Sequence, residues 1–276
     1  MTLERLTELE RLARRLEPDA ATRQRDCARV FDYADRYLER VASAPAFEYS
    51  EDRAAGLFEH PIGDDGIGLD AALDLVERHV DHEGIAPASG RFAGYIPGGG
   101  LLHAALGDFL AAVSNRYAGV FFADPGAVRI ESLLVRWMAG LAGLPASASG
   151  YLSAGGSGAT LSAVVTAREA CGIDGERIPR AVVYTTTETH HCVGKALQIA
   201  GLGRVQRREV AVDEGYRMRP DALAAAIDRD RAGGLAPWLL VASAGTTNTG
   251  AVDPLPELAE IARRAGLWLH VDAAYG

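Results

Sequence analysis

The sequence is short of lysine, of cysteine and of long apolar runs. Lys195 is the only lysine among 28 basic residues, and 37 acidic residues bring the net charge to −9. This acidic balance, without a basic stripe, argues against nucleic acid as a partner. The cysteines are few, odd in number and widely spaced, which argues against a disulfide framework or a zinc knuckle: Cys27, Cys171 and Cys192. We therefore expect a cytoplasmic protein.

Membrane-directed segments are also missing. No apolar run approaches the roughly 18 residues of a membrane-spanning helix. The N-terminus, MTLERLTELERLARRLE, is charged and helical in period, unlike a signal peptide. With 276 residues, 48% of them hydrophobic, the chain is long enough for one large domain and an accessory segment.

The first part of the chain is predicted to be helical. Leucines recur at steps of three and four residues over 3–16, and RVFDYADRYLERV and LDAALDLVERHV continue that period. A connector rich in Pro, Gly and acidic residues separates these two helices. We predict an N-terminal helical segment over 1–85 and a second, larger domain over 86–276.

The second part alternates short β-branched strands with helices. The predicted strands are RAVVYTT, VQRREVAV, PWLLVASAG and LWLHVDA, and helices lie between them. This order predicts an α/β fold with a mostly parallel sheet, in which ligands bind at the carboxyl ends of the strands. We place Trp137 and Trp268 in the core and the segment RDRAGG on a solvated face.

A glycine-rich loop, SAGGSGAT, runs from Ser153 to Thr160 into a helix. Glycines allow close backbone approach, and the N-terminus of a helix attracts phosphate. The alternative is a flexible connector whose helix is capped by Ser157. The loop has neither the Lys-Ser/Thr of a P-loop nor the GxGxxG spacing of a dinucleotide site.

Three further motifs fall near strand ends. In TTTETHHCVGKA, His190 is either a hydrogen-bonded structural residue or an imidazole that stacks on a bound aromatic ring. In SAGTTNTGAVDPL, Thr246 and Thr247 offer hydroxyls to a ligand or form a turn. In LWLHVDAAYG, Asp272 ends an apolar strand, where a carboxylate needs a cation.

The identity of that cation limits the kinds of ligand that could bind here. A Mg²⁺ ion in a nucleotidase would require a P-loop, which is missing, whereas a protonated ring nitrogen requires a carboxylate partner. A ligand with a phosphate, a basic ring nitrogen and an aromatic face satisfies all of these motifs. Pyridoxal 5'-phosphate (PLP) has all three features.

In this order and spacing, the motifs resemble those of the group II PLP-dependent amino-acid decarboxylases, the aromatic-amino-acid, histidine and glutamate decarboxylase family. The resemblance runs from about residue 30 to the end and includes GGSGATLSAVVTAR, THHCVGKA, GTT and HVDAAYG. It implies the aspartate-aminotransferase fold (PLP fold type I), a homodimer clasped by its N-terminal helices, and loss of the α-carboxylate of an L-amino acid as CO₂.

The resemblance also implies roles for individual residues. The phosphate would be bound by Gly155, Gly156 and Ser157. Around the ring, His190 would stack on one face and orient the substrate, Asp272 would pair with the ring nitrogen, Ala274 would pack on the other face, and Thr247 or Thr246 would lie close by. Tyr95 would line the substrate pocket. No metal ligand is implied. His79 and His82 share a helical face, so they are either a metal site or, as we favour, part of an exposed acidic helix end.

The sequence departs from the family pattern at three points. Gly158 replaces a glutamate after the phosphate-binding serine. The pocket positions that are aromatic in aromatic-amino-acid decarboxylases are Pro87, Ile96 and Gly119 here, which argues against a large aromatic substrate. The family's Schiff-base lysine follows the VDAAYG strand, and we do not assign that role to Lys195.

We therefore expect this chain to be a fragment that lacks the catalytic lysine and the small C-terminal domain, and to be strongly impaired by itself. Two alternatives remain at this point. One is another PLP enzyme of the same fold, such as an aminotransferase, a desulfurase or a carbon–carbon lyase. The other is a truncated homologue without activity.

Overall fold

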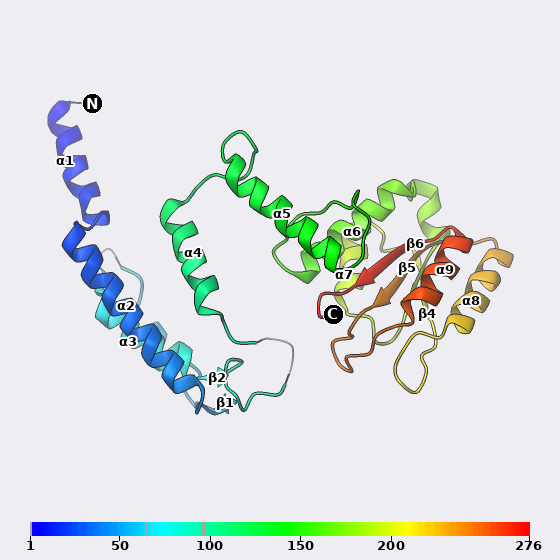
Figure 1. Cartoon of the computed structure of the whole chain (residues 1–276), viewed down its shortest axis with the longest axis horizontal. Coiled ribbons are helices and arrows are strands. Elements are labelled where there is room, and N and C mark those ends of the chain that lie inside the picture. Colours follow the sequence, from blue (N-terminus) through cyan, green and yellow to red (C-terminus); the bar gives the residue numbers. More distant parts are fainter. Residues whose placement is uncertain (1, 64–65, 95–97) are drawn as a thin grey trace. The chain divides into compact units, whose positions relative to one another are not determined.

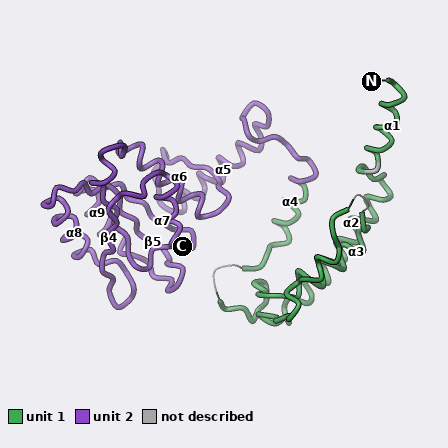
Figure 2. Tube along the Cα trace, turned by 180° about the vertical axis from the view of Figure 1, so that it is seen from behind, with its two compact units in different colours: residues 1–110 green, residues 111–276 purple. Residues whose placement is uncertain are grey.

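The chain forms two compact units in the computed structural model, which describes residues 2–63, 66–94 and 98–276. One unit covers 1–110 and the other 111–276 (Figure 2). The predicted helical segment, 1–85, lies within the first unit. The domain boundary that we placed at residue 85 stays a prediction.

The first unit is mostly helical, as predicted. Its elements are α1 (Leu3–Ala13), η1 (Arg14–Leu16), α2 (Ala20–Val41), η2 (Ala55–Glu59), α3 (Leu69–Val76) and the π-helical turn η3 (Glu77–Asp81). Asp19 caps α2 by accepting the N–H of Thr22 at 2.8 Å. A small antiparallel pair that we did not predict, β1 (Phe47–Glu48) and β2 (Gly84–Ile85), joins distant parts of this unit. None of the helices in the described ranges is both long and apolar enough to cross a membrane.

The second unit contains a parallel sheet in the order β4-β3-β5-β6. Figure 1 labels β4, β5 and β6 of this sheet. Its strands are β3 (Ala181–Thr185), β4 (Gln206–Glu209), β5 (Ala236–Ser243) and β6 (Trp268–Asp272). The four predicted strands are therefore confirmed. The helices are α5 (Pro125–Leu141), α6 (Gly156–Ala170), η4 (Gly175–Arg180), α7 (Cys192–Ile199), α8 (Pro220–Ala232) and α9 (Leu255–Ala265), and α4 (Leu102–Ser114) crosses the boundary between the units.

Helices cover both faces of this sheet. Alternate residues of β3 and β5 pack against α6 and α7 on one face and against α8 and α9 on the other. A strand buried on both faces needs apolar residues at nearly every position, which explains the continuous run AVVYT in β3. Because all four strands are parallel, their carboxyl ends lie at one edge of the sheet.

Two expectations about burial are wrong. Trp268 packs against the core, as predicted, but Trp137 on α5 is 63% exposed. The segment RDRAGG is not uniformly solvated either, because Asp230 is buried and accepts hydrogen bonds from Tyr184 and Arg208. Asp230 lies on the inward face of α8, one turn beyond Ala226 and Ile227.

Candidate functional site

The ends of β5 and β6 bring two of the predicted motifs together. Ser243 pairs with Asp272 across the sheet, and the N–H of Ala244 donates to the backbone oxygen of Asp272 at 2.9 Å. The Asp272 side chain is half-buried, and its Oδ1 accepts the N–H of Ala274 at 3.2 Å. The carboxylate therefore organises the tail that follows its own strand.

The GTT turn lies against that tail. Gly245 has a φ of 92°, and a Cβ added there would lie 3.1 Å from Cδ1 of Tyr275. Both the backbone angle and the close approach favour glycine at this position. The turn and the tail are thus neighbours, as their positions at the ends of adjacent strands predicted.

The two threonines of the turn have different surroundings. Thr246 is 4% exposed, and its hydroxyl lies 2.6 Å from that of Thr249 and accepts the N–H of Ala251 at 3.0 Å. Thr247 is exposed. Thr246 therefore holds the turn, whereas the hydroxyl of Thr247 is available to a ligand.

A carboxylate that the sequence analysis did not single out fixes the start of this turn. Asp253 is buried and accepts the N–H groups of Met218 at 2.7 Å and Ser243 at 2.8 Å. These bonds satisfy a buried acid with backbone donors. An acidic residue directly after the Thr-rich turn, in AVDPL, was the available signal in the sequence.

The glycine-rich loop reaches the same tail. Gly155 has a φ of 121°, and α6 begins at Gly156. A Cβ added at Gly156 would lie 3.1 Å from the Cβ of Ala274, closer than ordinary contact. Gly155, Gly156 and Ser157 are exposed, so the first turn of α6 is open to a ligand beside the tail.

His190 lies directly before α7, and α7 is tied to α6. The Nδ1 of His190 accepts the N–H of Cys192 at 3.3 Å, and the ring is half-buried. Cys192 is buried, and its Sγ donates to the hydroxyl of Thr160 in α6 at 3.6 Å. The His191 ring, 4.1 Å away between centroids, is exposed, and the charge of His190 lowers the pKa of His191.

His270 is a second residue that the sequence analysis missed. It lies two positions before Asp272 on β6, so the two side chains share a face of the strand. Its Nε2 is buried and has no hydrogen-bond partner among the described residues. Burial lowers the pKa of His270, and the nearby Asp272 opposes that shift.

Lys195 and Gly119 lie within the described part of the chain, but two of the predicted pocket residues do not. Tyr95 and Ile96 fall outside the described residues, and Lys195 is exposed on α7. At Gly119, an added Cβ would lie 2.8 Å from Cε2 of Tyr117, so the Tyr117 ring occupies the space that a side chain at 119 would need.

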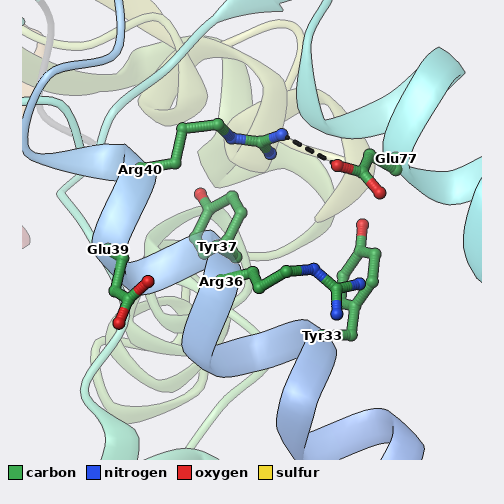
Figure 3. Close-up of a pocket in the computed structure, with 6 residues that line it drawn as sticks. All are labelled: Tyr33, Arg36, Tyr37, Glu39, Arg40 and Glu77. Carbon is green, nitrogen blue, oxygen red and sulfur yellow. Dashed lines mark hydrogen bonds and ion pairs between the residues drawn. The ribbon is translucent and has the colours of Figure 1, made fainter.

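A separate pocket of about 440 Å³ lies in the first unit (Figure 3). It contains none of the residues above. Arg40 bonds to Glu77 at 3.3 Å, and the guanidinium of Arg36 lies 5.9 Å from the centre of the Tyr33 ring. Because these arginines already have partners, the pocket does not supply the unpaired charge that an anionic ligand would need.

The residues present fit PLP. The cluster combines an open helix N-terminus, a glycine whose Cβ would press on Ala274, and a half-buried carboxylate at the end of β6. These are the groups that a phosphate and a protonated ring nitrogen require.

Comparisons with known proteins agree with this assignment. The family model described as "Pyridoxal-dependent decarboxylase conserved domain" matches residues 76–276. The chain is 37% identical over 198 residues to an aromatic-L-amino-acid decarboxylase of Bacillus atrophaeus, covering 72% of this chain and 39% of that protein. It is 35% identical over 261 residues to L-tyrosine/L-DOPA decarboxylase 2 of Lophophora williamsii, covering 89% and 49%.

A solved structure is also similar. The crystal structure of Oryza sativa TDC with PLP and tryptamine matches with a TM-score of 0.83 and 26% identity, covering 93% of this chain and 56% of that one. This similarity confirms the predicted fold class. The chain spans about half the length of the relatives it matches.

Proposed function

Because the chain belongs to the pyridoxal-dependent decarboxylase family, we propose that the protein removes the α-carboxylate of an L-amino acid as CO₂ with PLP as its cofactor. One observation carries the proposal. The α6 N-terminus and the GTT turn both lie against the tail after β6, at Ala274 and its neighbours. When bound, PLP supplies the electron sink for the bond that breaks.

The phosphate end of the site is formed by the first turn of α6. We assign phosphate binding to the backbone N–H groups of Gly155, Gly156 and Ser157, with help from the hydroxyl of Ser157. The helix dipole favours the negative charge, and the exposure of this turn leaves its N–H groups accessible.

The ring end is formed by three side chains. Asp272 would hold a proton on the ring nitrogen, His190 would cover one face of the ring and orient the substrate carboxylate, and Ala274 would contact the other face. The bond from the Ala274 N–H to Asp272 fixes both residues relative to each other. Thr247 rather than Thr246 would contact the cofactor, since the Thr246 hydroxyl is engaged within the turn.

We also propose a cytoplasmic homodimer in which the N-terminal helices contact the partner subunit and Tyr95 lines the substrate pocket. Large apolar side chains of α1, α2, α4 and α5 are exposed in the single chain. The three cysteines are unpaired, as expected in a reducing compartment. The residues at 87 and 119, which are not aromatic, favour a substrate other than a large aromatic amino acid.

Product analysis tests the proposed reaction. The product of the complete reading frame is incubated with PLP and single L-amino acids, and CO₂ and keto acid are measured. We expect CO₂ without an equivalent of keto acid. Asp272→Asn should lower kcat at least about a hundredfold, because an amide cannot hold the proton on the ring nitrogen.

Asp228→Asn on the exposed face of α8 is the matched control and should retain wild-type activity. Keto acid in place of CO₂ would assign the protein to the aminotransferases instead. An Asp272→Asn variant as active as the wild type would contradict the proposed role of this carboxylate.

A further inference from the structure

A cluster of metal-ligating side chains lies in the first unit, apart from the residues assigned to PLP. Asp52, His79 and Glu83 each offer one ligand atom, and the three atoms lie within 4.8 Å of one another. Asp52 precedes η2, His79 lies in the π-helical turn η3, and Glu83 follows that turn. The cluster thus joins two segments that are distant in sequence.

The imidazole of His79 is held in place but incompletely bonded. Its ring packs against the backbone at Gly56, where an added Cβ would lie 2.7 Å from Cε1 of His79. Its Nδ1 is buried and has no hydrogen-bond partner in the described part of the chain. A buried polar atom without a partner calls for an explanation, and an absent ion is one.

The nearby acidic residues differ in whether they form an ion pair with an arginine. Arg40 pairs with Glu77 at 3.3 Å (Figure 3) and with Asp81 at 3.7 Å. Across 2–63, 66–94 and 98–276, Asp52 and Glu83 form no such ion pair. Two unmatched carboxylates beside an imidazole therefore leave a local excess of negative charge.

His79 and His82 have different partners, although they are only three residues apart. His82 lies 2.6 Å from a guanidinium nitrogen of Arg40 and 3.6 Å from the carboxylate of Glu48. The sequence placed both histidines on one exposed helix end. The structure separates them, and only His79 belongs to the cluster.

We propose that Asp52, His79 and Glu83 bind a zinc ion, with water completing the coordination. One imidazole nitrogen and two carboxylate oxygens are a donor set that zinc accepts, whereas calcium and magnesium take oxygen ligands. Zinc–ligand bonds of about 2.0–2.2 Å place ligand atoms closer together than the upper limit of 4.8 Å found here. The Asp52 side chain is exposed, and its Oδ2 also accepts the N–H of Gly56 at 3.0 Å.

The zinc ion would tie the segment before η2 to the end of η3. Among the described residues of this unit, no hydrophobic side chain is buried, and Ser89 is the one fully buried residue. Small units with little apolar core are commonly stabilised by a metal or a partner. The proposal is independent of the residues assigned to the cofactor, which all lie in the second unit.

Zinc titration of the 276-residue chain, stripped of metal beforehand, tests the site. Calorimetry should show a binding event in the wild type that His79→Gln and Glu83→Gln each weaken at least about tenfold. His82→Gln, the matched control, should stay within about twofold of the wild type, since His82 is bonded to other groups.

The proposal is overturned if the wild type binds no zinc, if His79→Gln binds it as tightly as the wild type, or if His82→Gln loses as much affinity. Should His79→Gln fail to fold by circular dichroism, Asp52→Asn decides, because Asp52 is exposed and its substitution spares the core. Wild-type zinc affinity in both Asp52→Asn and Glu83→Gln would also refute the site.

Discussion

Gly156 shows how one missing side chain can shape a binding site. A Cβ at this position would lie 3.1 Å from the Cβ of Ala274, whereas a Cβ at Gly158 would meet no described atom within 4 Å. The two glycines lie in the same turn of α6 and differ only in what faces them. The tail after β6 therefore restricts position 156 and leaves position 158 free.

We predict that Gly156→Val weakens PLP binding at least about tenfold, because the branched side chain pushes the tail away from the α6 N-terminus. Gly158→Ala should bind PLP like the wild type. Titration of PLP into each variant, followed by tryptophan fluorescence, measures the dissociation constants. Equal losses in the two variants would show that the contact with Ala274 is irrelevant.

Protonation of His270 should make the stability of the fold depend on pH. Its pKa is lowered by burial, so below the unfolded-state value of about 6.5 the unfolded chain binds a proton that the folded chain does not. The free energy of unfolding should therefore fall as the pH drops below about 6.5, by up to about 1.4 kcal/mol per pH unit, and level off below the folded-state pKa.

The prediction is that His270→Gln removes this part of the pH dependence. Urea unfolding of the wild type and the variant at pH 7.5 and 5.5 measures it, and carboxylates common to both proteins cancel in the comparison. Parallel pH profiles for the two proteins would mean that His270 is protonated equally in the folded and unfolded states.

At the scale of elements, a buried hydrogen bond joins β3 to α8. Tyr184 is fully buried, and its hydroxyl donates to Oδ2 of Asp230 at 2.9 Å. Arg208 on β4 donates to Oδ1 of the same carboxylate at 3.0 Å. Burial raises the pKa of Tyr184, and the hydrogen bond to Asp230 raises it further. The hydroxyl therefore stays protonated and remains a donor.

Tyr184→Phe should lower the free energy of unfolding by about 1–3 kcal/mol, because it leaves a buried carboxylate oxygen without its donor. Tyr216→Phe, at a side chain that is exposed, should change it by less than about 0.5 kcal/mol. Urea denaturation of both variants compares them directly. A Tyr184→Phe variant as stable as the wild type would show that water replaces the hydroxyl.

At the scale of the whole molecule, burial is unevenly distributed. Among the residues that the structure describes, the buried hydrophobic ones all lie between Val164 and Leu267, while long apolar side chains earlier in the chain are exposed. On α5 they recur at steps of four, three and four residues, which is a continuous stripe: Ile130, Leu134, Trp137 and Leu141. Such a stripe is typical of a contact surface.

We predict that Trp137→Glu combined with Leu141→Glu reduces self-association of the chain without loss of stability, since both side chains are exposed in the single chain. Arg136→Glu, beside the stripe on the same helix, should leave association unchanged. Sedimentation velocity over a concentration series measures association, and urea unfolding checks the fold. Identical sedimentation of the double variant and the wild type would exclude this stripe as the contact surface.

Local patterns along the chain predicted much of this protein. Residues that alternate or recur every three to four positions reveal strands and helices, and all four strands of the second unit were found in this way. The position of the GTT turn beside the tail after β6 also followed from the sequence, because parallel strands place their carboxyl ends at one edge. Such features depend on neighbours in sequence, so the sequence alone determines them.

Contacts between distant segments were decided only by the tertiary structure. The sequence could not separate Thr246 from Thr247, place Trp137 outside the core, bury Asp230, or give His79 and His82 different partners. Whether a side chain is covered depends on which segment packs over it. A periodic pattern shows that a face is apolar, but only the packed fold determines what, if anything, covers that face.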